Sequence, residues 1–466
     1  MLDIFRISDS DELTDKLLLD YIQNNDKLTV SRYQKLWDAY NNEYDIYNEP
    51  EKPSWMSDFR TSVNFARVIT DTFEGMFLGI PIRVKSDDDR TDEYINTLDA
   101  MTDADDINAE LSSIVSIFGR GYRIVFVDED GDIGTAYLDP MESFAIYNQS
   151  ITPRMRYFVR TYTETLADGT SLRRGSISDD TYVRYFTIDG SNIIWDEQYA
   201  HGFAGVPAVE FIQNRARRGI FEDVLPLIDF VNETVSAKMN DINSIAQHII
   251  KILGAKFDTA ALQNLRNMHI INVEGKNAAD LVVEFLTPPN ADSSQEHLLD
   301  RLERLIFTIA MVCDITNDGF AASSGIAIRW KMTPMINLAT NKWRKFEHSL
   351  KLYYKLVCSN PVSPVNEDAW ITLEFLHQLS YPVNMFEEAE MAGVLSGITS
   401  RETQLSVLSV VDDPKKELER IQEEAKSDLT SLTMPTNRTV TEYYQSPSER
   451  VKDAKASIEQ GGDSNA

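Results

Sequence analysis

The stretch Glu222–Leu253, "EDVLPLIDFVNETVSAKMNDINSIAQHIIKIL", is where the sequence changes from strand patterns to long helical patterns. Pro226 fits the first turn of a helix, where its missing N–H leaves no hydrogen bond unmade. The apolar spacing predicts one helix over the whole stretch, about 45 Å long at 1.5 Å per residue. Apolar residues recur every three or four positions, at Val224, Ile228, Val231, Val235, Ile242, Ile249 and Leu253. The other face is polar, with Asp229, Glu233, Ser236, Asn240, Asn243 and Gln247.

Before this stretch, the sequence alternates as strands do. The segment "YRIVFVDEDGDIGTAYL" (Tyr122–Leu138) alternates around an acidic turn and predicts a hairpin. The strand pattern runs from Ser113 to Phe211, and a helical spacing over Ser62–Leu78 precedes it. We therefore expect residues 1–220 to form an α+β region with one largely antiparallel sheet.

After this stretch, the pattern predicts a small module and a returning helix. Residues 254–291 contain the short strand signals "HIINV" and "LVVEFL" and end at a Pro-Pro pair. Residues 292–313 return to helical spacing. One helix therefore leads out, an α/β module follows, and a second helix leads back.

Small residues interrupt the helices next, in "NDGFAASSGIAIRWK" (Asn317–Lys331). Glycine permits backbone conformations that other residues avoid. The sequence predicts a loop over residues 314–328. Taken alone, this loop is a flexible connector between two helices.

A long helix and a strand are expected over residues 329–384. The apolar positions Ile336, Ala339, Trp343, Phe346, Leu350, Tyr353 and Val357 alternate in steps of three and four. This spacing is compatible with either a coiled coil or a long packed helix. Between Arg329 and Val357 the sequence contains one acidic residue, Glu347, and seven basic residues. The basic residues are Arg329, Lys331, Lys342, Arg344, Lys345, Lys351 and Lys355.

The C-terminal part is predicted to be helical and then disordered. Asn384, Ser400 and Asp413 each stand where a helix N-cap is expected. We therefore expect short helices over residues 385–427. Residues 428–466 are polar and contain prolines and a Gly-Gly pair, which is typical of a disordered tail.

Composition excludes several classes of function. The formal net charge is −29 and the isoelectric point is near 4.6. A protein that grips nucleic acid usually carries a basic surface, so an ordinary sequence-reading DNA binder is disfavoured. The two cysteines form no disulfide framework, and no apolar run approaches the roughly 20 residues that span a bilayer. We expect an intracellular protein without a secretion signal or a membrane segment.

No catalytic or cofactor-binding motif is present in the sequence. The chain contains no P-loop, no H-E-x-x-H and no G-x-S-x-G pattern, and its six histidines are scattered. We therefore expect no enzyme activity, no cofactor and no metal. These grounds leave open a protein that surrounds DNA without holding it and an intracellular scaffold that binds other proteins without nucleic acid. A third alternative is an enzyme whose site the sequence patterns do not reveal.

Several segments, in order, resemble tailed-bacteriophage portal proteins, the head–tail connectors of phages of Gram-positive bacteria. The last segment is the most specific, and together they span most of the chain. They are "FLGIPIRV" (Phe77–Val84), "FGRGYRIVFVDEDGDI" (Phe118–Ile133), "LDPMESFAIY" (Leu138–Tyr147), "GVPAVEF" (Gly205–Phe211), "SGIAIRWK" (Ser324–Lys331) and "LSGITSRETQLSVLSVVDDPKKELERIQEE" (Leu395–Glu424).

The resemblance implies a structural role in a virion. Portal proteins form a dodecameric ring at one capsid vertex and nucleate procapsid assembly together with scaffolding and major capsid proteins. The ring docks the large subunit of the terminase motor and later the head-completion (adaptor) and tail proteins. Double-stranded DNA passes through it without sequence specificity during packaging and ejection. The expected location is the portal vertex of the virion, and the host cytoplasm during assembly.

The resemblance also assigns the parts of the chain. It implies a wing over residues 1–220 and 329–384, a stem over 221–253 and 292–313, a clip over 254–291, a tunnel loop over 314–328 and a crown over 385–427. The loop residues expected to approach DNA are Asn317, Asp318, Gly319, Phe320, Ala321, Ala322, Ser323, Ser324 and Gly325.

Two further groups of basic residues are candidate contact sites. In the clip, Lys256, Arg266 and Lys276 would contact partner proteins, or they are ordinary surface charges. On the long helix, we expect a basic face that forms salt bridges to the acidic region Ser86–Glu110 of a neighbouring subunit. The alternatives for this face are DNA contact and a solvated surface. Its residues are Lys342, Arg344, Lys345, Lys351 and Lys355.

Overall fold

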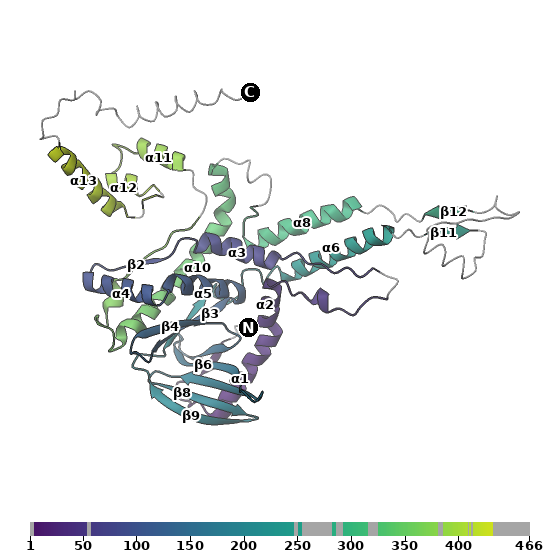
Figure 1. Ribbon diagram of the computed structural model, residues 1–466, viewed down its shortest axis with the longest axis horizontal. Coiled ribbons are helices and arrows are strands. Elements are labelled where there is room, and N and C mark those ends of the chain that lie inside the picture. The colour runs from purple at the N-terminus through teal and green to yellow at the C-terminus, as the bar shows by residue number, and fades with distance from the viewer. Residues whose placement is uncertain are drawn as a thin grey trace, which may run out of the picture. The chain divides into compact units, whose positions relative to one another are not determined.

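The computed structural model describes residues 4–53, 57–246, 250–253, 282–285, 292–315, 325–380, 385–408, 410–411 and 413–431. The chain divides into two compact units. The first comprises Met1–Ala322 with Arg329–Ser380, and the second comprises Ser323–Ile328 with Tyr381–Ala466. The first unit mixes helices and sheets, as expected, and Figure 1 shows its elements.

A six-stranded sheet of order β1-β5-β6-β7-β8-β9 forms one part of the first unit. Neighbouring strands pair antiparallel, except for β1, which pairs parallel with β5. The strands are β1 (Phe5–Ile7), β5 (Ser143–Asn148), β6 (Met155–Thr165), β7 (Ser171–Ser178), β8 (Tyr182–Asp189) and β9 (Asn192–Ala200).

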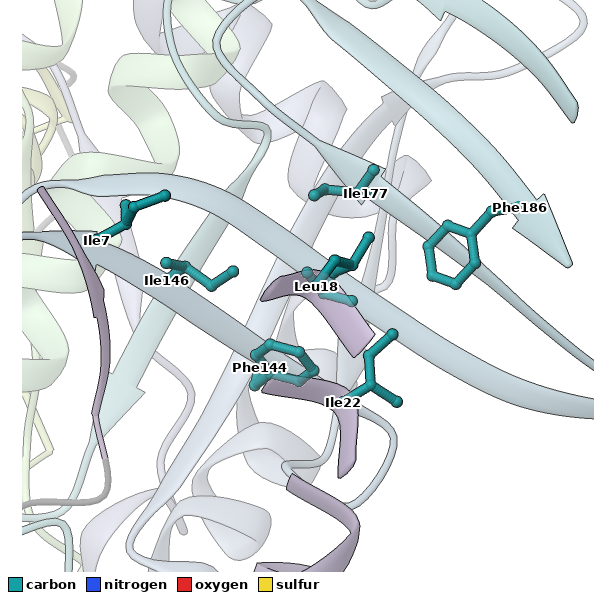
Figure 2. Packing of buried hydrophobic residues seen from close by; sticks show 8 residues of the cluster. Ile7, Leu18, Ile22, Phe144, Ile146, Ile177 and Phe186 are labelled. Atoms are coloured by element: carbon teal, nitrogen blue, oxygen red, sulfur yellow. The ribbon is translucent and has the colours of Figure 1, made fainter. Parts of the chain in front are cut away.

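Helix α1 (Asp15–Leu28) covers one face of this sheet. Thr14 caps the helix by accepting the N–H of Leu17. Leu18 and Ile22, one turn apart, point into a buried cluster with side chains from the strands, including Phe144 and Phe186 (Figure 2). The chain continues through a π-helical turn (Thr29–Tyr33) into α2 (Gln34–Tyr40) and a short 3-10 helix (Asp45–Asn48).

A second sheet, of order β10-β3-β4, packs beside the first. Its strands β3 (Arg120–Val127), β4 (Ile133–Leu138) and β10 (Ala208–Ile212) are antiparallel, which confirms the expected hairpin. The prediction of one sheet is therefore wrong, and so is its start at Ser113. Helix α5 (Ala104–Phe118) continues through that position because its apolar residues follow helical spacing up to Phe118.

Three helices and a small strand pair complete this region. They are α3 (Phe65–Phe77), α4 (Asp89–Met101) and α5, with β2 (Arg83–Lys85) pairing with β13 (Glu374–Leu376). Much of the acidic stretch Ser86–Glu110 lies in α4 and α5. Asp88 caps α4 by accepting the N–H of Thr91, so this acidic side chain has a structural role.

The helix expected over Glu222–Leu253 is shorter than predicted. Helix α6 covers Leu225–Ala246, and β11 (Ile250–Leu253) pairs antiparallel with β12 (Val282–Phe285). The run of β-branched residues near Ile250 favours a strand, whereas apolar spacing alone fits both structures. Helix α8 (Asp292–Ala310) follows, as expected.

Helix α10 (Gly325–Ser359) starts earlier than predicted and contains Pro334. Gly325 and the next three residues therefore belong to a helix rather than to the loop, because "IAIRWK" can continue the apolar pattern of the helix behind it. A 3-10 helix (Ala369–Thr372) leads into β13.

The second unit contains short helices, as predicted. They are α11 (Met385–Val394), α12 (Arg401–Leu405) and α13 (Pro414–Ser431). Ser400 caps α12 by accepting the N–H of Thr403 at 3.2 Å, and Asp413 accepts the N–H groups of Lys415 and Lys416. Helix α13 continues four residues into the predicted tail, and residues 432–466 lie outside the described part of the chain.

Candidate functional site

Helices α6 and α8 form a pair that flanks the β11–β12 strands in the sequence. The two helices lie side by side in Figure 1 and contact each other. Val231 on α6 and Leu302 and Ile306 on α8 are buried, and Lys238 forms an ion pair with Glu296 across the pair. The pair therefore holds together through an apolar seam and a charged contact.

The polar face of α6 binds another segment of the same chain, which the sequence did not predict. Asn240 accepts the N–H of Phe59 at 2.7 Å and donates to its carbonyl at 2.9 Å. Ser236 accepts the N–H of Thr61 at 3.0 Å and donates to its carbonyl at 2.9 Å. One turn earlier on α6, a third side chain makes a similar contact.

Asn232 accepts the N–H of Val63 at 2.7 Å. We call Asn232, Ser236 and Asn240 the polar ladder, and Ser57–Val63 the strap. The ladder side chains are 1%, 5% and 9% exposed, respectively. Each of these bonds from the ladder to the strap ends on a backbone atom, so the ladder does not depend on the side chains of the strap. Beyond the ladder, Asn243 on α6 donates to the Ser57 hydroxyl at 2.7 Å.

A charged contact fixes the start of α6. The guanidinium of Arg32 donates from Nε and Nη2 to the two carboxylate oxygens of Glu222, at 2.8 Å each. Burial opposes ionisation of Glu222, but Arg32 outweighs it and lowers the pKa of this carboxyl. Arg32 also donates to the carbonyl of Arg217 at 2.6 Å. The residues just before α6 are thereby joined to the π-helical turn that follows α1.

The apolar seam of α10 packs against other parts of its own chain. Of the two alternatives predicted from its spacing, α10 is therefore the long packed helix and not the coiled coil. Ala339, Leu350 and Val357 are buried. The ring of Phe346 lies 4.8 Å from that of Phe211 and 6.0 Å from that of Phe77, centroid to centroid. The helix is thus part of the core of the first unit.

Lys342 on α10 is buried and forms an ion pair within the chain. Its Nζ donates to Glu74 Oε1 at 2.6 Å and to the hydroxyls of Ser112 and Ser116 at 2.7 and 3.0 Å. The side chain is 0% exposed. Burial lowers the pKa of the Lys342 amine, against the attraction of the Glu74 carboxylate.

The prediction that Lys342 belongs to an exposed basic face is therefore wrong. Position 342 lies three residues after Ala339 and four before Phe346, so helical geometry places it on the buried face. A count of basic residues along the sequence does not contain this information. The charge of Lys342 is instead matched by Glu74 on α3.

The remaining four basic residues of this group lie nearer the surface of α10. Arg344 and Lys355 are exposed, and Lys345 and Lys351 are partly exposed. Lys351 pairs with Glu347 at 2.6 Å, and Lys355 lies 5.5 Å from the ring centroid of Trp370. Their proposed contacts with another subunit stay a prediction.

Helix α10 does reach the acidic stretch of its own chain, through a neutral residue. The hydroxyl of Tyr354 donates to the Asp99 carboxylate, at 2.8 and 3.0 Å to its two oxygens. Burial raises the pKa of Asp99 to about 6. This contact is therefore sensitive to pH near neutrality.

Several predicted site residues lie outside the described part of the chain. These are the clip residues Lys256, Arg266 and Lys276, and the loop residues Asn317, Asp318, Gly319, Phe320, Ala321, Ala322, Ser323 and Ser324. None of the helices in the described part of the chain combines the length and the apolar character of a membrane-spanning segment. That part of the chain also contains no cluster of His, Cys, Asp or Glu that could hold a metal ion.

Comparisons with known proteins identify the family. A family model described as "Phage portal protein, SPP1 Gp6-like" matches residues 19–430. The chain is also similar to the "Portal protein" of Bacillus phage SPP1, with 23% identity over 405 residues, covering 82% of this chain and 79% of the relative. The resemblance to portal proteins seen in the sequence is confirmed. Because the family match covers most of the chain, this protein belongs to the SPP1 Gp6-like family of phage portal proteins.

Proposed function

We propose that twelve copies of this chain form a ring at one vertex of a phage capsid, and that double-stranded DNA passes through the ring during packaging and ejection. The observation that carries the proposal is the portal family match over residues 19–430. Portal proteins are structural rather than enzymatic. The long packed helices of this chain fit a mechanical role.

Each part of the chain has a place in this ring. The two sheets with α1 to α5 and α10 form the wing, the α6–α8 pair forms the stem, and α11 to α13 form the crown. The module between α6 and α8, which includes β11 and β12, forms the clip. In this proposal the clip docks the large terminase subunit during packaging and the head-completion protein afterwards. The wing contacts scaffolding and major capsid proteins as the procapsid forms.

Exposed apolar residues on the stem support contact with neighbouring subunits. Large apolar side chains that gather on a projecting element usually mark a protein interface. In a closed ring, each subunit presents two different surfaces to its two neighbours. The stem residues concerned are 38–58% exposed: Phe230, Met239 and Ile242 on α6, and Leu298, Leu305 and Ile309 on α8.

The net charge of −29 fits a conduit that does not retain DNA. Duplex DNA carries one phosphate per about 1.7 Å, and each phosphate neutralised by Lys or Arg strengthens binding. An acidic channel wall would repel phosphates and keep DNA mobile. The electrostatic potential of the channel in an assembled ring tests this point, and a strongly positive lumen throughout would contradict it.

The loop between α8 and α10 is the proposed DNA-facing element. Its sequence from Asn317 to Ser324 contains no basic residue, so we propose that it touches DNA through steric fit and weak polar contacts. A bulky substitution such as Ser323→Trp should block packaging in a reconstituted system while rings still assemble. Normal packaging with the loop cross-linked in place would count against this role.

Charged residues of the clip and of α10 are proposed protein contacts. Reversing Lys256, Arg266 and Lys276 to Glu should weaken terminase binding if they form the docking surface, and unchanged binding would make them ordinary surface charges. Arg344, Lys345, Lys351 and Lys355 are proposed to form salt bridges between subunits.

Electron microscopy of the purified protein tests the ring directly. We expect particles with a central hole, and twelvefold symmetry in those assembled on procapsids. Two results would instead favour a scaffold protein that binds no nucleic acid: particles that are monomers without a central hole, and DNA packaging that proceeds when this protein is absent.

A further inference from the structure

We propose that Asn232, Ser236 and Asn240 are positioning residues, which hold the α6–α8 pair in one orientation by binding the backbone of the strap. The inference rests on the proposed function only for the use made of that orientation, namely the presentation of the clip. The ladder itself is a binding site for an extended polypeptide, and the occupant is residues 57–63 of the same chain.

The ladder and the strap match in repeat length. Four residues of an α-helix rise about 6 Å, and two residues of an extended strand rise about 6.6 Å. Every fourth residue of α6 therefore meets every second residue of the strap, over three successive contacts. Because alternate backbone groups of a strand point in opposite directions, a slip by one residue would turn the bonded groups away from α6. The match selects one register.

The strap is anchored at its C-terminal end. Asn64 donates to the carbonyl of Tyr40 at 2.9 Å and caps α3 by accepting the N–H of Arg67 at 3.1 Å. The C-terminal end of the strap is therefore joined to the packed core of the first unit.

Arg60 ties the strap to the segment that precedes it in the chain and also makes an ion pair within the strap. Arg60 donates to the carbonyls of Glu49 and Pro50 at 2.6 and 2.9 Å. It also pairs with Asp58 at 2.8 Å. The strap thus acts as a brace rather than a free loop.

The ladder adds a support for α6 at a distance from its start, in addition to the packing of α6 against α3. The Arg32–Glu222 contact lies just before the helix begins. Asn240 lies about 22 Å further along the helix than Leu225, at 1.5 Å per residue. A rod held at one end can tilt, whereas a rod held at two separated points has a defined direction. Loss of the ladder should therefore change the orientation of α6 more than the packing of the core.

The test compares two variants that differ in one group. Ser236→Thr keeps the hydroxyl that binds Thr61, and Ser236→Val replaces it with a methyl group of similar size. Both are made in full-length protein carrying spin labels at Asp241→Cys on α6 and Thr97→Cys on α4, both exposed positions. Cys313 is replaced by Ala, while Cys358 is buried and its thiol pKa is raised to about 11, so it should not react.

Labelled chains are diluted into unlabelled chains, so that each measured distance lies within one subunit. We expect Ser236→Val to broaden the label-to-label distance distribution and to speed exchange of the Thr61 amide hydrogen by about tenfold, the equivalent of one lost hydrogen bond. Ser236→Thr should match the parent protein in both measurements. The midpoint of thermal unfolding of the core should differ little between the two.

Equal distance distributions for the two variants would overturn the inference, whatever their packaging activity, because the hydroxyl of residue 236 would then not matter. This holds whether both distributions match the parent protein or both are broadened. A parent protein that forms no ring would overturn the proposed function instead, and the distance measurement would still decide the role of the ladder.

Discussion

Helices α6 and α10 are tied to the N-terminal part of the chain in contrasting ways. Helix α10 uses a charged side chain, Lys342, which pairs with Glu74 inside the core. Helix α6 uses neutral side chains, Asn240 among them, which bind the backbone of the strap. The first attachment depends on particular side chains, whereas the ladder–strap attachment depends on the chemistry that every backbone shares.

The difference teaches how each attachment can fail. A buried ion pair has costly desolvation, so removing one partner leaves an uncompensated charge. A neutral hydrogen bond contributes about 0.5–1.5 kcal/mol net, and its loss is local. We therefore expect the Lys342–Glu74 attachment of α10 to be sensitive to charge and pH, and the ladder–strap attachment of α6 to be insensitive to both but dependent on register.

The largest effect should come from breaking the buried ion pair. Glu74→Gln keeps the shape of the side chain but leaves Lys342 without a counter-charge, and should cost about 3–5 kcal/mol of unfolding free energy. The double variant Glu74→Gln/Lys342→Met should recover much of this loss. Urea unfolding of the three proteins measures it, and a single variant as stable as the parent would contradict a charged anchor.

A pH-dependent effect should follow from Asp99, beside Tyr354 on α10. Its pKa is raised to about 6 in the fold, against about 3.9 in an unfolded chain. Stability linked to this group is therefore present below about pH 4 and is lost as pH rises through about 6. Asp99→Asn should stabilise the protein by about 3 kcal/mol at pH 8 and by almost nothing at pH 4. A pH-independent difference would refute this assignment.

A smaller effect, independent of charge, should come from the polar ladder. Asn240→Ala leaves the N–H and carbonyl of Phe59 without these partners and should cost about 1–2 kcal/mol. Because the ladder is neutral, the cost should be the same at pH 6 and pH 8 and in high salt. Thr234→Ala, on the same helix but bonded only to the carbonyl of Phe230 in its own helix, is the matched control. A strong salt dependence would remove the contrast with α10.

The smallest effect on a single chain should come from the exposed basic residues of α10. Lys351→Gln removes a surface pair with Glu347 and should change the unfolding free energy by less than about 0.5 kcal/mol. If the basic face joins subunits, the same substitution should lower the midpoint of ring dissociation measurably more than that of unfolding. Equal shifts in the two midpoints would show that Lys351 makes no contact between subunits.

Much of the fold could be predicted where local chemistry decides the structure. The β3–β4 hairpin follows from alternation around an acidic turn, and Ser400 and Asp413 cap helices as expected. Prediction failed where two structures share one pattern. Near Ile250 the apolar spacing suits a helix and a strand equally, whereas the β-branched residues favour the strand, which pairs with β12.

The site was less predictable than the fold. The Asn-x-x-x-Ser-x-x-x-Asn spacing on α6 is visible in the sequence, but nothing there indicates that its partner is an extended segment near residue 60. For Lys342 the prediction was wrong, because it grouped this residue with exposed basic residues although Lys342 is buried and paired with Glu74. The predicted loop and clip contacts stay predictions.

By itself, the sequence determined most of the helices, the β3–β4 hairpin and the acidic balance of this protein, because apolar period, capping residues and composition can be read without the fold. The ordered motifs along the chain indicated the family. Only the tertiary structure decided which polar residues form hydrogen bonds or ion pairs with distant parts of the same chain. Burial and hydrogen bonding join residues far apart in sequence: Asn240 meets Phe59, and Lys342 meets Glu74. Desolvation makes such partners necessary, and the three-dimensional fold decides which residues they are.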